Sequence, residues 1–269
     1  MAKACGTRCF SKRSKSRSFR SLHELAPSHD RDYTPSAERS AMSHQLTFYG
    51  HSAWELKTPE GRLLIDPFFT GNPAATIQAS EAKADFIALT HGHGDHVGDC
   101  VDIAKRTGAT VIAVYEICEW LGKHGVANTH GMNAGGGFKF PFGRLKQTIA
   151  HHSSVLPDGT YGGNPVGLHV TLNSGTTIYH AGDTALFSDM KLYAEGGLDL
   201  AILPIGDNYT MGVDDALRAV EWLRPKRVLP THYDTWPVIA ADAERFATEA
   251  MRRFGVKVTV LRPGQTFAW

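Results

Sequence analysis

Cysteine and long apolar runs are scarce in this chain of 269 residues. The four cysteines, Cys5, Cys9, Cys100 and Cys118, form no C-x-x-C pair, which disfavours a disulfide framework and is typical of a reducing compartment. The most apolar stretch, Leu198 to Ile205, is far shorter than the roughly 18 apolar residues that a membrane-spanning helix needs. These absences predict a cytoplasmic protein that does not span a membrane.

A strong excess of either charge is also absent, since 28 Lys and Arg face 27 Asp and Glu, but the two signs are unevenly distributed. Residues 1–43 hold nine basic and four acidic residues, whereas residues 44–269 hold 19 basic and 23 acidic residues. A mildly acidic body disfavours a broad nucleic-acid-binding surface, because such a surface depends on clustered Lys and Arg. We therefore expect no nucleic acid among the partners.

The first 43 residues are rich in Ser and Arg and show no apolar periodicity. This composition predicts a disordered basic N-terminal extension, followed by one folded domain over residues 44–269. It is also typical of an organelle transit peptide, so organelle import is the alternative to the cytoplasm. A start codon assigned too far upstream is a further alternative, in which Met42 opens the working protein.

The body alternates short apolar stretches with Gly, Pro and Asp, and it is long enough to bury a sizeable core. Runs at 46–49, 53–56 and 62–65 predict an antiparallel meander. From residue 85 onward, predicted strands alternate with predicted helices, which indicates mixed sheets covered by helices in an α/β or α+β domain. The strands are expected at 86–90, 110–114, 145–150, 166–172, 176–180, 198–203, 227–230 and 256–261, and the helices at 97–106, 116–123, 213–223 and 242–254. The Gly-rich segment 133–137 lacks the Gly-Lys-Ser/Thr ending of a phosphate-binding loop and is interpreted as a flexible connection.

The densest group of potential metal ligands is the segment Thr90-His91-Gly92-His93-Gly94-Asp95-His96, which follows an apolar strand and precedes a helix. Residues i, i+2 and i+4 of an extended segment share a side, so His91, His93 and Asp95 can converge on one point. The start of the helix turns His96 toward a neighbouring point. Imidazole and carboxylate ligands suit zinc, iron or manganese.

Three further strands run into potential ligands at their ends. One leads into His151-His152, one into Asp183, and one into His232. Residues at corresponding edges of neighbouring strands can gather around one site, and the candidates are then too many for one tetrahedral ion. The sequence therefore predicts two metal ions and seven candidate ligands, which are His91, His93, Asp95, His96, His152, Asp183 and His232.

These residues resemble the metallo-β-lactamase fold superfamily, whose signature is H-x-H-x-D-H followed by a single His, an Asp and a final His. The body is most similar to the bacterial metal-dependent hydrolases related to L-ascorbate-6-phosphate lactonase, the UPF0173-like group. The resemblance implies an αββα sandwich with the site on one rim. It rests on the phrases at 49–53, 65–68, 90–99, 130–133, 179–184, 203–207 and 231–233.

The resemblance also implies the grouping of the ligands. One metal ion is expected on His91, His93 and His152, the other on Asp95, His96 and His232, and Asp183 is expected to bridge them. Successive strand residues point to opposite faces, so only one of His151 and His152 reaches the metal, and the family pattern favours His152. The expected cofactors are two divalent ions, with zinc favoured over manganese or iron.

The expected activity follows from the two ions, which would lower the pKa of a bridging water so that hydroxide is available near neutral pH. Asp95, His93 and Asp183 are the expected catalytic residues, with Asp95 orienting the hydroxide. The predicted function is hydrolysis of an ester, lactone or related bond in a small molecule, with no membrane partner, and a homo-oligomer is left open. The alternatives are a phosphodiesterase or nuclease of the same superfamily, and a metal-binding protein without catalysis.

Seven further residues are candidates for the surroundings of the metal ions. Asp66 could accept a hydrogen bond from a metal-bound His, with a turn or capping role as the alternative. His51, His130 and His180 could line the pocket or receive a proton, with a structural role as the alternative. The last three, Asn133, Asp207 and Thr231, could bind substrate or simply cap loops.

Overall fold

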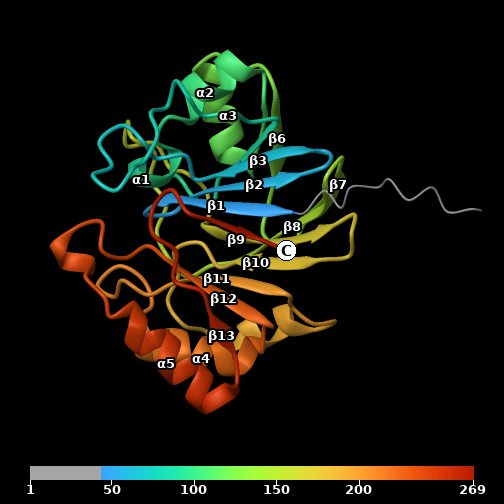
Figure 1. Ribbon diagram of the computed structural model, residues 1–269. Coiled ribbons are helices and arrows are strands. Elements are labelled where there is room, and N and C mark those ends of the chain that lie inside the picture. The colour runs from blue at the N-terminus through green and yellow to red at the C-terminus, as the bar shows by residue number, and fades with distance from the viewer. Residues whose placement is uncertain (1–43) are drawn as a thin grey trace, which may run out of the picture. The chain divides into compact units, whose positions relative to one another are not determined.

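The computed structural model describes residues 44–269, so the extension predicted over residues 1–43 lies outside the described part. Within residues 44–269, two seven-stranded sheets pack face to face, and helices cover the outer face of each (Figure 1). The four-layer αββα sandwich predicted from the sequence is confirmed. None of the helices in this described range is long and apolar enough to cross a membrane.

The first sheet contains both the meander and the first parallel strands. Strand β1 pairs antiparallel with β2 and β14, and β3 to β6 run parallel to one another. The spatial order is β14-β1-β2-β3-β4-β5-β6. The bounds are β1 (Gln45–Gly50), β2 (Ala53–Thr58), β3 (Gly61–Ile65), β4 (Phe86–Ala88), β5 (Thr110–Val114), β6 (Thr129–Met132) and β14 (Thr266–Ala268).

The second sheet combines an antiparallel half with a parallel half. Strands β7, β8, β9 and β10 pair antiparallel, and β10 to β13 run parallel. The spatial order is β13-β12-β11-β10-β9-β8-β7. The bounds are β7 (Gly137–Phe140), β8 (Gly143–Ile149), β9 (Val166–Leu172), β10 (Thr177–His180), β11 (Leu200–Pro204), β12 (Arg227–Thr231) and β13 (Lys257–Val258).

The last helix begins at a capping carboxylate and ends at a glycine. The carboxylate of Asp242 accepts the amide proton of Arg245 and caps the start of the last helix, and Gly255 ends that helix with a φ of 67°. In Figure 1, α2 and α3 cover the first sheet, and α4 and α5 cover the second. The bounds are α1 (Gly94–Val97), α2 (Cys100–Thr107), α3 (Tyr115–Lys123), α4 (Val213–Leu223) and α5 (Ala243–Phe254), with short 3-10 helices at Ser188–Ala194 and Pro237–Ile239.

The core between the sheets is apolar and includes one polar link that matters for the site. Trp54 on β2 is 1% exposed, and its indole N–H donates to Thr231 Oγ1 on β12 at 3.0 Å. A buried Trp stabilises a core through its large apolar area, but its N–H must find an acceptor. The link therefore connects the two sheets at the carboxyl end of β12, directly before His232.

The direction of the strands determines where functional side chains can gather. In the first sheet the carboxyl ends of β3 to β6 lie on one edge, because these strands are parallel. In the second sheet β8 and β10 are both antiparallel to β9, so their carboxyl ends share an edge with those of β11 and β12. The predicted ligands lie in the segments that follow β4, β8, β10 and β12.

Several element predictions were wrong in detail. The helix expected at 97–106 is two helices, because Gly98 breaks it with a φ of 42°, and a Cβ there would lie 2.5 Å from the carbonyl oxygen of Pro67. The strand expected at 256–261 is only β13. Strands β6, β7 and β14 were not predicted.

Candidate metal centre

The ligand-rich segment after β4 bends tightly under a neighbouring loop. A Cβ on Gly92 would lie 3.2 Å from Ser154 Oγ, and the amide of Gly92 donates to that oxygen at 3.0 Å. Glycine therefore permits the close approach of this loop. His91 and His96 are fully buried, whereas His93 and Asp95 are partly exposed.

One carboxylate oxygen lies at the centre of the cluster. Asp183 Oδ2 is 3.0 Å from His232 Nε2, 3.3 Å from His96 Nε2, 3.6 Å from His152 Nε2 and 4.0 Å from His91 Nε2. Asp183 is 3% exposed and follows β10. A single buried oxygen therefore faces histidines from three other strand ends.

The first ligand group contains His91, His93 and His152, with ligand atoms within 4.8 Å of one another. His91 Nε2 and His93 Nδ1 are 2.9 Å apart. The neighbouring His151 lies elsewhere, since its ring centroid is 4.8 Å from that of Phe187. His152, and not His151, therefore lies with the other two histidines.

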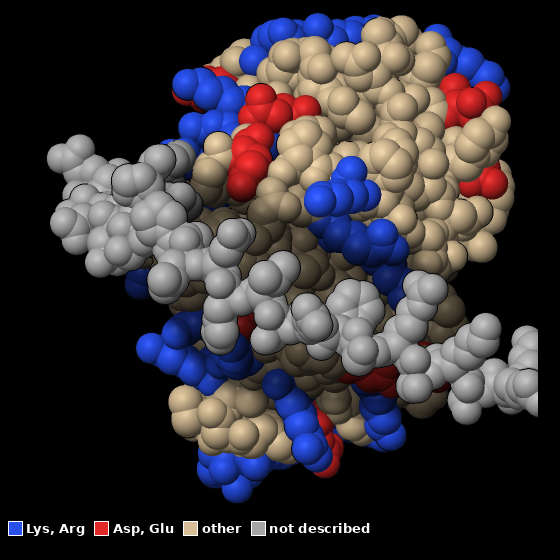
Figure 2. Space-filling model, turned by 90° about the vertical axis from the view of Figure 1, so that its right-hand side faces the viewer, with Lys and Arg blue, Asp and Glu red and all other residues tan. Residues whose placement is uncertain are grey.

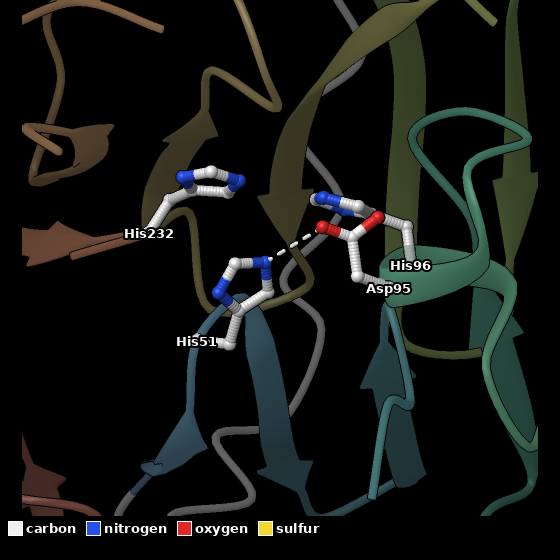
Figure 3. A group of neighbouring side chains, drawn as sticks. All are labelled: His51, Asp95, His96 and His232. Atoms are coloured by element: carbon white, nitrogen blue, oxygen red, sulfur yellow. Dashed lines mark hydrogen bonds and ion pairs between the residues drawn. The ribbon is translucent and has the colours of Figure 1, made fainter. Parts of the chain in front are cut away.

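The second ligand group contains Asp95, His96 and His232, and the structure adds His51 to it (Figure 3). His51 follows β1, and its Nε2 lies 3.2 Å from Asp95 Oδ2. In Figure 3 the side chains of His51, of the neighbours Asp95 and His96 in α1, and of His232 converge on one space. His51 was predicted only as a pocket or proton-transfer residue, without a ligand role.

Asp66 orients the His96 ring through its Nδ1, the nitrogen that does not face Asp183. Its Oδ2 lies 2.8 Å from His96 Nδ1 and accepts the Thr90 hydroxyl at 2.7 Å, while its Oδ1 accepts the Thr90 amide at 2.8 Å. A carboxylate at Nδ1 holds the proton there and leaves the lone pair of Nε2 for a metal ion. This placement agrees with the outer role considered for Asp66.

His51 is held with similar precision, through both its side chain and its backbone. Thr235 Oγ1 lies 2.8 Å from His51 Nδ1, and the His51 carbonyl accepts the His232 amide at 2.8 Å and the Thr231 hydroxyl at 2.8 Å. His51, Asp66 and His232 all have positive φ values, of 56°, 45° and 53°. Left-handed backbone costs energy in residues other than glycine, and it concentrates at functional sites.

The pKa values of most histidines in the cluster are lowered. Burial lowers the pKa of His51 to about 4, and burial also lowers the pKa of His91, His93 and His152. A neutral imidazole keeps a lone pair for a metal ion. Most of the candidate nitrogens are therefore in the form that a metal ion requires.

The pKa values of Asp183 and His96 depart in the directions expected for a pair of opposite charges. Burial would raise the pKa of Asp183, but His232 and His96 outweigh it and hold that pKa well below the usual range. Burial would lower the pKa of His96, but Asp183 and Asp66 outweigh it and raise that pKa well above its ordinary value. These opposite shifts are those of a buried imidazole that lies beside buried carboxylates.

The cluster fits divalent metal ions on its own chemistry. The donors are imidazole nitrogens and carboxylate oxygens, a set that suits zinc, manganese and iron. His96 Nε2 is buried without an aligned hydrogen-bond partner in residues 44–269, although it lies beside Asp183. A buried polar nitrogen ordinarily has a partner, and a metal ion bound between His96 and Asp183 would supply one.

The remaining predicted residues are dispersed. Thr231 bonds Trp54 and His51, as described above, and His180 accepts the amide of Gly182 at Nδ1 without joining either ligand group. His130 packs against Phe138, with ring centroids 4.3 Å apart, because β6 and β7 bring them together outside the cluster.

The two predicted substrate-binding residues outside the cluster lie in different pockets. Asn133 lines a pocket that also includes His152. Asp207 accepts the amide of Asn208 in its own loop and lines a different pocket. Of the two, only Asn133 shares a pocket with a predicted metal ligand.

Three hydroxyl side chains at the site were not predicted. Thr90 bonds Asp66, Thr235 bonds His51, and Ser153 Oγ lies 3.3 Å from His93 Nε2. Thr90 and Ser153 are adjacent to predicted ligands, and that adjacency was the available signal. Thr235 follows His232 by three residues in a loop with no distinctive pattern.

The fold and the cluster define a metal-dependent hydrolase of the β-lactamase superfamily, and comparisons with known proteins agree. The family model described as the Beta-lactamase superfamily domain matches residues 61–233. A UPF0173 metal-dependent hydrolase of Thermus thermophilus is 52% identical over 221 residues, which cover 82% of this chain and 97% of the relative. One from Carboxydothermus hydrogenoformans is 48% identical over 224 residues, covering 82% and 98%.

A solved structure of a metallo hydrolase also matches this chain. The metallo hydrolase Igni18 from Ignicoccus hospitalis matches with a TM-score of 0.77 and 36% identity, over 84% of this chain and 98% of that chain. The chain belongs to the β-lactamase superfamily and, within it, to the UPF0173 metal-dependent hydrolases.

Proposed function

We propose that the protein is a binuclear hydrolase that cleaves an ester, lactone or related bond of a small molecule. The observation that carries the proposal is the position of Asp183 Oδ2, within 4.0 Å of one nitrogen of each of four histidines. Two of these histidines belong to each proposed ligand set. An oxygen shared in this way favours two ions over one.

The proposed ligand sets are His91, His93 and His152 for one ion, and Asp95, His96 and His232 for the other, with Asp183 between them. When bound, two divalent ions supply a hydroxide nucleophile near neutral pH and polarise the oxygen under attack. Zinc is proposed first, with manganese and iron as alternatives, because these donors accept all three.

The protein's own side chains would hold the reacting groups in place. His51 Nε2 lies 3.2 Å from Asp95 Oδ2 and fixes it, which leaves the other carboxylate oxygen of Asp95 to ligate the ion, to orient a water beside it and to carry a proton toward the leaving group. The Asp95 side chain is 30% exposed and therefore remains within reach of substrate. His93 is also partly exposed, and Ser153 Oγ lies 3.3 Å from its Nε2.

The partners and location that we propose follow from composition and surface charge. On the face shown in Figure 2, Lys and Arg side chains of the described residues are scattered and interrupted by Asp and Glu. This distribution supports a small-molecule substrate over a nucleic acid. A cytoplasmic location, with no membrane partner, is part of the same proposal, and a homo-oligomer remains compatible with it.

The test is an activity panel with protein loaded separately with zinc, manganese and iron. Lactones, aryl esters and phosphodiesters are assayed with wild type, His93→Ala and Asp183→Ala. The proposal expects hydrolysis of lactones or esters by wild type and a loss of at least about 100-fold in both variants. Preferential cleavage of phosphodiesters would favour the nuclease-like alternative, and equal rates in all three proteins would refute a role for the cluster.

A further inference from the structure

A polar pocket of about 700 Å³ borders the first ligand group on the side of His152. It lies where the Gly-rich segment 133–137 crosses from β6 in the first sheet to β7 in the second. Its walls include Asn133 after β6, Asn164 before β9, Ile149 at the end of β8, and His151 and His152.

The Gly-rich segment is fastened and does not act as a loose connection. The amide of Gly135 donates to the Gln147 carbonyl at 2.8 Å, and the amide of Gln147 donates to the Gly136 carbonyl at 2.9 Å. The amide of Gly136 also donates to the Asn133 carbonyl at 2.9 Å. Asn133 is therefore held against β8, and the interpretation of this segment as a flexible connection was wrong.

Both carboxamides of the pocket have their oxygens occupied. Asn133 Oδ1 accepts the amide of Ala134 at 2.9 Å, and Asn164 Oδ1 accepts the Tyr161 hydroxyl at 3.1 Å. Both side chains are exposed to the pocket, and neither Nδ2 donates to another group within residues 44–269. The pocket thus presents two NH₂ groups, with two N–H donors each, beside a predicted metal ligand.

Charge is absent from this wall. The part of the chain that the structure describes contributes no Lys, Arg, Asp or Glu to the lining. A phosphate group is ordinarily held by Arg, Lys or a set of backbone amides, so this pocket offers it no charged partner.

The pocket on the other side of the site is no better suited to an anion. It has a volume of about 450 Å³, is lined in part by His51, and contains Arg262 together with Asp234, Asp242 and Glu244. Three carboxylates against one guanidinium repel a phosphate.

We propose that the pocket of Asn133 and Asn164 holds the part of the substrate away from the scissile bond, and that this part is uncharged and rich in oxygen acceptors. Hydroxyl, ether or carbonyl oxygens, as in a polyhydroxylated lactone, accept hydrogen bonds from the two free NH₂ groups, and Ile149 covers the adjacent carbon skeleton. The proposal rests on the proposed hydrolase function and specifies its substrate class: a sugar-like lactone or ester without phosphate.

The test measures binding, so that it does not depend on turnover. The probes are a sugar δ-lactam, an analogue of the lactone that resists hydrolysis, and the same lactam carrying a phosphate on its terminal hydroxyl. Calorimetric titration of the metal-loaded full chain is expected to give tighter binding of the uncharged lactam. Asn133→Asp and Asn164→Asp, which exchange the free donor for an anionic acceptor, are each expected to weaken that binding on the order of tenfold.

Asn128→Asp is the matched control, because Asn128 precedes the amino end of β6 whereas Asn133 follows its carboxyl end. This control is expected to bind the lactam as wild type does, and elemental analysis is expected to give the same metal content in all four proteins. Tighter binding of the phosphorylated lactam, no binding of either probe, or unchanged binding by Asn133→Asp and Asn164→Asp would overturn the proposal. A protein that binds the lactam but hydrolyses no ester or lactone would refute the proposed function and leave the binding pocket standing.

Discussion

Replacement of Asp66 by Asn tests how the protein prepares His96 for a metal ion. Asp66 is fully buried, and its carboxylate accepts three hydrogen bonds, two from Thr90 and one at His96 Nδ1. An amide can supply only one acceptor oxygen at these positions. The Thr90 amide needs the acceptor at Oδ1, so the NH₂ group of Asn would face His96 Nδ1.

The consequence is a change of tautomer. Nδ1 would then accept a hydrogen bond, and the proton of a neutral His96 would move to Nε2, the nitrogen that faces Asp183. A metal ion must displace that proton. Loss of such an outer hydrogen bond typically weakens metal binding by 10- to 100-fold, which corresponds to about 1.4 to 2.7 kcal/mol.

The assay is competition with a chelator of known affinity, and thermal unfolding of the metal-free variant checks that it folds. Asp99→Asn is the matched control, because the Asp99 carboxylate accepts two backbone amides, from Phe69 and Thr70, and contacts no predicted ligand. We expect Asp66→Asn to lose affinity for one of the two ions and Asp99→Asn to keep both affinities. A folded Asp66→Asn protein with wild-type affinity for both ions would refute the reasoning.

Three further predictions concern pH, backbone geometry and the N-terminal extension. His96 has a raised pKa and must lose its proton to bind a metal ion. The apparent affinity for the metal ion is therefore expected to fall about tenfold for each pH unit below that pKa. A metal affinity that does not change between pH 6 and 8 would contradict this. Gly98→Ala is expected to lower the free energy of unfolding by more than about 1 kcal/mol in a denaturant titration, because a Cβ at residue 98 would overlap the carbonyl of Pro67. The control is Gly122→Ala in α3, which has open space around it and is expected not to destabilise the protein. Deletion of residues 1–41 is expected to leave metal content and activity intact, and loss of either would show that the domain boundary is misplaced.

The ligand positions could be predicted because each one follows an apolar strand directly. Residues at corresponding edges of neighbouring strands can gather around one site, so His91, His152, Asp183 and His232 could be expected together. The alternation of strands and helices predicted mixed sheets covered by helices, and the family resemblance supplied the αββα order of the layers. The choice between His151 and His152 needed the family pattern, and the structure places only His152 beside Asp183.

The missing strands depend on contacts distant in sequence. Strand β6 has the sequence THGM, with two exposed positions, and is a strand because it pairs with β5. Strand β14 pairs with β1 at the other end of the domain, Gln45 opposite Ala268. Such pairing overrides local preference and leaves little periodicity to detect.

The hydrogen-bond partners of the ligands could not be predicted for a similar reason. The contact between Thr235 and His51 spans 184 residues, and that between Trp54 and Thr231 spans 177. No short motif specifies which hydroxyl will reach which ring. His51 could therefore be predicted as a residue of the pocket but not as a neighbour of Asp95.

The central claim is that the cluster is two metal sites that share Asp183, and metal stoichiometry tests it most directly. Elemental analysis of protein purified without added metal would compare wild type with His152→Ala and with its neighbour control His151→Ala. Two ions per chain are expected in wild type and in His151→Ala, and one in His152→Ala. A single ion in wild type, or equal loss in both variants, would contradict the account.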